Sequence, residues 1–142
     1  MEQSGEKNQG KKKVDEVTTF PVAFSLDENQ ETITINTNTP ATPSKKQIIN
    51  QAITFHLKGN IPEAKKYYEY CINQGFKDHL VFSNYGLILQ SLGNLENAEL
   101  STRKAIEINP NYAKAYSNLG NILSNLGNLQ EAEKYYYKAI KL

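Results

Sequence analysis

The sequence contains few of the side chains that bind metals or perform redox chemistry. It has one cysteine, Cys71, two histidines, His56 and His79, and no tryptophan among 142 residues. A single thiol cannot form an intramolecular disulfide, and these three side chains cannot supply the ligand spacing of a structural zinc site. No nucleophile lies beside a base in a catalytic pattern either. We therefore expect an intracellular, noncatalytic protein with no metal and no cofactor.

Long apolar runs and an excess of charge are also missing. No stretch approaches the ~20 apolar residues that cross a bilayer, and the first residues lack the apolar centre of a signal peptide. The 16 Lys and Arg residues nearly balance the 15 Asp and Glu residues, for a formal net charge of +1. This balance gives no electrostatic basis for binding nucleic acid or an anionic membrane. These absences predict a soluble, cytoplasmic protein that binds neither.

The composition changes near Ser44. Residues 1–44 contain four Lys and seven Asp plus Glu (4 − 7 = −3), together with three of the five prolines. Such a segment buries too little apolar surface to offset its chain entropy, which predicts a disordered polar tail. From residue 45 to residue 142 the apolar residues recur at intervals of three and four, as amphipathic helices require. We expect this part to be the folded domain.

The folded part contains an internal repeat. Gly59, Gly93 and Gly127 are spaced 93 − 59 = 34 and 127 − 93 = 34 residues apart. Each is followed by an asparagine, and each Gly-Asn pair separates two amphipathic stretches, which is typical of a glycine that ends a helix in the left-handed conformation. The unit is therefore a helical hairpin, with repeats at about 45–78, 79–112 and 113–142. The predicted helices are 45–58 with 61–74, 79–92 with 95–108, and 113–126 with 129–141.

These repeats resemble the tetratricopeptide repeat (TPR), a helical hairpin with a period of 34 residues. The third repeat carries the pattern in Tyr116, Leu119, Gly120, Leu123, Ala132, Tyr136 and Ala139. The second repeat departs from it at Thr102, where a large aromatic residue is usual, and the first repeat is looser. The resemblance implies an all-α, right-handed α-solenoid of three TPR hairpins (six helices), with a concave groove that holds an extended peptide. The SNLGN segment also looks like the repeats of O-GlcNAc transferases.

The groove face is expected on the first helix of each hairpin, where residues spaced four and three apart share one side. The predicted peptide-binding residues are Lys46, Asn50 and Ile53, then Leu80, Asn84 and Leu87, then Lys114, Asn118 and Asn121. Asn50, Asn84 and Asn118 occur once per repeat, and an amide can both donate to and accept from a peptide backbone. They form either a ladder of backbone-reading amides or an ordinary feature of the family copied by duplication.

Some proteins of this family hold the C-terminus of a chaperone with a carboxylate clamp. The clamp requires Lys and Asn in the first repeat, where this chain has Ile49 and Ile53, and a basic residue where Asn118 stands. Only Asn84 and Lys114 fit, so we do not assign a clamp. The residues favour a noncatalytic module that binds an extended segment of a partner protein. The alternative is the N-terminal arm, or a truncated remnant, of a larger glycosyl-, methyl- or sulfotransferase.

Several side chains carry expectations about packing on the second helices. Cys71 occupies a position where the later repeats have alanine, which favours a packed side chain over a reactive thiol. Tyr68 and Tyr136 are expected in the core, whereas Tyr67 and the other tyrosines beside them are candidate contact residues.

The C-terminal helix carries a further set of apolar side chains. We expect Leu129, Tyr136, Ala139 and Ile140 to face the preceding helices, which leaves Tyr137 and Leu142 as exposed apolar surface. Exposed patches of this kind usually mark contacts. The pattern predicts a homodimer through the C-terminal edge, and the alternative is a monomer whose last turn is mobile.

Overall fold

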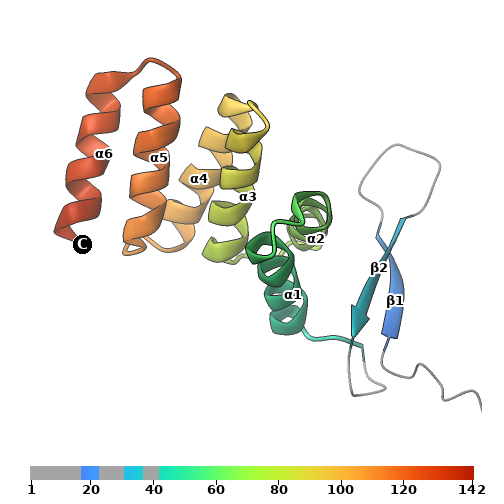
Figure 1. Ribbon diagram of the computed structural model, residues 1–142. Helices are drawn as coiled ribbons and strands as arrows, with labels where there is room; N and C mark the ends of the chain where they lie inside the picture. Colours follow the sequence, from blue (N-terminus) through green and yellow to red (C-terminus); the bar gives the residue numbers. More distant parts are fainter. Residues whose placement is uncertain (1–16, 23–30, 37–41) are drawn as a thin grey trace, which may run out of the picture.

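The computed structural model describes residues 17–22, 31–36 and 42–142, and the last of these segments is a stack of helical hairpins (Figure 1). Every helix begins at its predicted residue and ends within one residue of its predicted end. The six helices of this segment are α1 (Lys45–Leu57), α2 (Ile61–Asn73), α3 (His79–Ser91), α4 (Leu95–Ile108), α5 (Ala113–Asn125) and α6 (Leu129–Lys141). The predicted α-solenoid of three hairpins is confirmed.

The hairpin turns depend on glycine at the end of each first helix. Gly59, Gly93 and Gly127 have φ angles of 76°, 79° and 84°, a left-handed conformation that side chains with a Cβ rarely adopt. Gly75, with φ 75°, ends α2 in the same way, a turn that the sequence analysis did not single out. The chain therefore reverses direction at the positions that carry the 34-residue period.

Side chains also fix where α1 and α3 begin. Ser44 and Gln47 form a capping box, in which the Gln47 backbone N–H donates to Ser44 Oγ at 3.2 Å and the Ser44 backbone N–H donates to Gln47 Oε1 at 2.8 Å. The Asp78 carboxylate accepts from the backbone N–H groups of Leu80 and Val81 at 2.8 and 3.3 Å. These bonds satisfy donors that have no partner within the helix.

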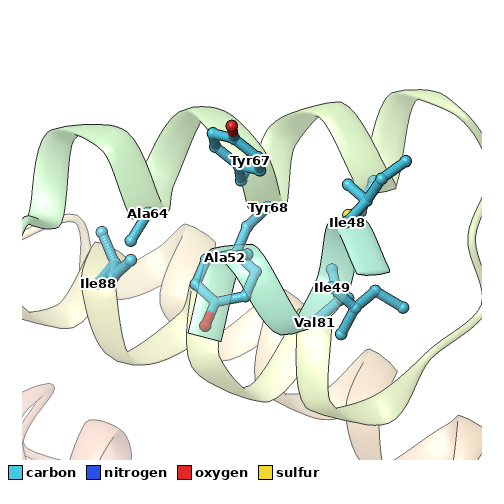
Figure 2. Close-up of a cluster of buried hydrophobic side chains, with 9 residues drawn as sticks. Ile48, Ile49, Ala52, Ala64, Tyr67, Tyr68, Val81 and Ile88 are labelled. Carbon is cyan, nitrogen blue, oxygen red and sulfur yellow. The ribbon is translucent and has the colours of Figure 1, made fainter. Parts of the chain in front are cut away.

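The largest hydrophobic cluster lies between α1, α2 and α3 (Figure 2). Its buried members are Ile48, Ile49, Ala52, Ala64, Tyr67, Tyr68, Cys71, Val81 and Ile88. Cys71 is fully buried, and burial raises the pKa of its thiol to about 12, so the packing role predicted for it is confirmed. Tyr68 is a core residue, as expected. Tyr67 is also buried, because its ring packs 5.2 Å from the ring of Phe55, so the prediction that it is a contact residue was wrong.

The two helices of the second hairpin approach closely at Gly86. A Cβ atom placed on Gly86 would lie 2.4 Å from Thr102 Oγ1 and 3.2 Å from the Ala98 carbonyl oxygen. Thr102 is fully buried, and its hydroxyl donates to that same carbonyl oxygen at 2.8 Å. The unusual threonine therefore fills the place of the expected aromatic residue, and its polar group is satisfied within α4.

Part of the predicted tail forms a β-hairpin. Strands β1 (Val17–Val22) and β2 (Glu31–Asn36) pair antiparallel, with Phe20 opposite Ile33. The sequence analysis did not predict these strands, although alternating β-branched residues favour extended pairing despite the polar composition. The other predicted tail segments 1–16, 23–30 and 37–41 lie outside the described residues. No helix in the described part is long and apolar enough to cross a membrane.

Candidate functional site

The predicted groove residues lie on α1, α3 and α5, but they differ in how much solvent reaches them. Exposed side chains are Lys46, Asn50, Lys114 and Asn121. Half-buried side chains are Ile53, Leu80, Asn84 and Leu87, and Asn118 is buried. The face is therefore accessible at most of the predicted positions, and its three repeated asparagines are in three different environments.

Asn118 is engaged in an internal contact. Its side chain is only 6% exposed, and its Nδ2 donates to Ser83 Oγ at 3.2 Å, joining α5 to α3. Ser83 is fully buried. A peptide-binding ladder requires amides that are open to solvent. The Asn118 amide is buried, because it joins the first helices of two neighbouring repeats.

Asn84 belongs to a small polar cluster with Tyr68 and His56. Burial raises the pKa of Tyr68 above its usual value, while a hydrogen bond with the Asn84 side chain acts in the opposite direction. His56 Nδ1 lies 3.4 Å from Tyr68 Oη. Burial lowers the pKa of His56, and the positive charge of Lys114 lowers it further. The cluster is therefore neutral near pH 7, and it partly occupies the Asn84 amide.

The two exposed asparagines also differ from each other. Asn121 Oδ1 accepts a hydrogen bond of 2.6 Å from Tyr136 Oη on α6, so its oxygen is already used. The Asn50 side chain makes no hydrogen bond with any of the residues described here. Among the repeated asparagines Asn50, Asn84 and Asn118, Asn50 is therefore the most available to a ligand.

An open pocket of about 650 Å³ lies where the first turns of α1 and α3 meet the turn after α2. We call it the end pocket. Its lining includes three of the predicted groove residues, Lys46, Asn50 and Leu80. It also includes residues that the sequence analysis did not assign to a site, which are Lys45, Ile49, Gly75, Phe76, Lys77 and Asp78.

Phe76 and Lys45 form one wall of the end pocket. Lys45 Nζ lies 5.1 Å from the centroid of the Phe76 ring, within the range of a cation–π contact. Phe76 also packs edge-to-face against Tyr70. The GFKD turn has no helical periodicity, so the sequence analysis could not place it on the groove face. The signal that could have identified it as part of a site was an aromatic residue beside a lysine in a turn.

The two clamp positions of the first repeat lie against the core of the first hairpin. Ile49 is buried in the core cluster and Ile53 packs against it, so the first repeat has no polar side chains at the two clamp positions. Among the residues that the model describes, no group of three His, Cys, Asp or Glu side chains could hold a metal ion.

The exposed surface of α6 is larger than predicted. Tyr137 and Leu142 are 58% and 53% exposed, as expected. However, Leu129 and Ile140 are 65% and 80% exposed, so the prediction that they face the preceding helices was wrong. The preceding helices contact the side of α6 that carries Ala132 and Tyr136, which pack in the core cluster beside α5.

Comparison with known proteins identifies the repeats. Two models of the tetratricopeptide repeat match residues 81–112 and 102–134. No curated protein matches the chain.

Solved structures give the same result for the fold. The second TPR of Spaghetti (RPAP3), bound to the HSP90 peptide SRMEEVD, is 22% identical with a TM-score of 0.64, over 69% of this chain and 91% of that chain. The first TPR of the same protein, bound to the same peptide, is 23% identical with a TM-score of 0.63, over 68% and 77% of the two chains.

MamA is 22% identical with a TM-score of 0.64, over 72% of this chain. The matched region spans 60% of the MamA chain. Tetratricopeptide repeats are therefore present in this chain, and its helical part has the fold of a tetratricopeptide repeat domain.

Proposed function

We propose that residues 42–142 form a noncatalytic interaction module that binds an extended segment of a partner protein along the face of α1, α3 and α5. The observation that carries the proposal is that most of the predicted positions on this face are accessible and that three of them, Lys46, Asn50 and Leu80, line the end pocket. Two of the similar solved structures are TPR domains bound to a peptide, which supports the same use of the fold here.

The accessible residues suit an extended peptide for a physical reason. Asn50 offers both amide donors and an acceptor to a backbone that has lost its water. Leu80 and Leu87 are half-buried apolar side chains on the same face, and they can cover an apolar side chain of the ligand. Such a combination of a few polar groups with apolar surface gives a peptide both orientation and affinity.

Selection from a random-sequence phage-displayed peptide library tests this proposal, with the binding affinity of the selected peptides measured by calorimetry. We expect Asn50→Ala and Leu87→Ala each to weaken binding by about 1 kcal/mol, the usual net value of one hydrogen bond or a partly buried aliphatic contact. Asn97→Ala, at an exposed position of α4, is the matched control and should bind as the unmodified chain does. Equal affinities for all four proteins would contradict binding on this face.

We further propose that the chain is cytoplasmic and that the exposed side of α6 pairs two copies into a homodimer. The area of apolar side chains left in solvent on α6 supports the second point. The alternative role as an arm or remnant of a larger glycosyl-, methyl- or sulfotransferase stays a prediction, as does the likeness to O-GlcNAc transferase repeats.

A further inference from the structure

The end pocket combines an apolar lining with a basic one. Ile49, Phe76 and Leu80 supply the apolar part. The volume of about 650 Å³ falls within the ~300–1,000 Å³ typical of ligand pockets. A pocket of this size accommodates a large aliphatic or aromatic side chain together with the peptide bonds on either side of it.

The charges around the pocket are strongly unbalanced. Three lysines, Lys45, Lys46 and Lys77, line it with a single carboxylate, Asp78, for a formal charge of 3 − 1 = +2. Asp78 already accepts two backbone hydrogen bonds at the start of α3. None of the three lysines has a carboxylate within 4 Å anywhere in the described segments. Elsewhere Lys65, Lys66 and Lys104 do form such pairs.

The pocket is also continuous with the proposed binding face, because Lys46, Asn50 and Leu80 belong to both. A segment that lies along α1 and α3 can therefore place a side chain in the pocket. Basic groups and an apolar recess lie together in this pocket, which favours acidic side chains beside one apolar side chain.

We propose that the end pocket selects an acidic segment of the partner protein that carries one large apolar side chain. The apolar side chain packs against Ile49, Phe76 and Leu80, and flanking carboxylates pair with Lys46 and Lys77. This inference rests on the proposed function, since it names the chemistry of the segment that the same face binds. It uses internal acidic side chains and does not require a terminal carboxylate.

Three fluorescein-labelled peptides with blocked ends test the inference on the full chain by fluorescence anisotropy. The first is GSEDFEESG, the second replaces its Phe by Ser, and the third replaces its Glu and Asp residues by Gln and Asn. We expect the second and third peptides to bind about 10-fold more weakly than the first, or ~1.4 kcal/mol. Raising the NaCl concentration from 0.1 to 1 M should weaken only the binding of the acidic peptides, because the screening length falls from about 10 Å to about 3 Å.

Protein variants separate the pocket from general charge. Lys46→Gln with Lys77→Gln should weaken binding of the first peptide about 10-fold. The matched control, Lys134→Gln with Lys141→Gln, makes the same change in net charge at exposed positions of α6 and should leave binding within about twofold. A Leu80→Gln variant should also weaken binding of the first peptide and have little effect on the Ser-substituted one. Circular dichroism confirms that each variant is folded.

Three results would overturn the inference in distinguishable ways. If library peptides bind and need Leu87, but neither their acidity nor Lys46 and Lys77 affects the affinity, the inference fails and the proposed function stands. If neither the library nor GSEDFEESG yields binding to the folded chain, both fail. A free-acid C-terminus that alone restores binding would also contradict the role of internal carboxylates.

Discussion

Asn118 lies inside the solenoid because a neighbouring repeat supplies it with a partner. Its Nδ2 donates to Ser83 Oγ across the contact between α5 and α3, and both side chains are buried. Asn84 interacts with Tyr68 on the preceding helix in a comparable way. Asn50 is in the first of the described repeats and remains exposed. One repeated residue thus has a structural role within the stack and stays open to solvent in the first described repeat, where we propose that it binds a peptide.

This difference explains which part of the candidate site the sequence could predict. Helical periodicity placed Asn50, Asn84 and Asn118 on one face, and that placement follows from the spacing within each helix. Whether each asparagine is open to a ligand depends on the neighbouring helix that packs against it. That contact joins residues far apart in the sequence, so helical spacing does not reveal it. The sequence also gave no register for the turn that carries Phe76 and Lys77, so the end pocket was not predictable from helical spacing alone.

We predict that Asn118→Ala lowers the free energy of unfolding by about 1–3 kcal/mol, because it leaves the buried Ser83 hydroxyl without its partner. Urea denaturation measures the change. Ser83→Ala combined with Asn118→Ala should cost less than the sum of the two single substitutions, since no polar group is then left unpaired. Asn97→Ala is the control for removing an exposed amide from a helix. Additive effects of the two substitutions would show that the hydrogen bond contributes nothing.

At the scale of whole helices, the hairpins depend on residues that allow close approach or a reversal of direction. The left-handed glycines end the first helices at Gly59, Gly93 and Gly127, and the capping groups of Ser44 and Asp78 fix two starts. These are local signals, which is why helix boundaries could be predicted closely. The sequence analysis did not predict the pairing of β1 with β2. Residues 1–44 are polar overall, and the alternating pattern of Thr and Ile within them is short.

We predict that Gly86→Ala destabilises the second hairpin, although alanine favours a helix over glycine by about 1 kcal/mol. The new Cβ atom would lie 2.4 Å from Thr102 Oγ1, and relieving such overpacking typically costs ~1–3 kcal/mol. Thermal unfolding followed by circular dichroism measures the change. In a Thr102→Ala background the nearest obstacle is gone, so the same substitution should be much less harmful. An equal penalty in both backgrounds would place the strain elsewhere.

At the scale of the whole molecule, stacking covers one side of α2 and one side of α4 with the next repeat. Ile72 on α2 and Ile106 on α4 are half-buried and pack against core clusters. Ile140 occupies the same position of the repeat on α6 (106 + 34 = 140) and is 80% exposed. Tyr137 and Leu142 on the same helix end are exposed as well, so several apolar side chains of α6 remain in solvent.

We predict that two copies of the chain associate through this surface of α6. Each Å² of apolar area removed from water contributes roughly 25 cal/mol, and a twofold arrangement lets the same patch cover itself. Sedimentation velocity over a range of concentrations should detect a dimer. Tyr137→Lys combined with Ile140→Lys should return it to a monomer, because charge would be buried at the centre of the contact. Leu57→Lys combined with Leu92→Lys also replaces two exposed apolar side chains by lysine, at the ends of α1 and α3, and should leave the dimer intact. A chain that sediments as a monomer at every concentration, or a dimer that survives the α6 substitutions, would exclude this contact.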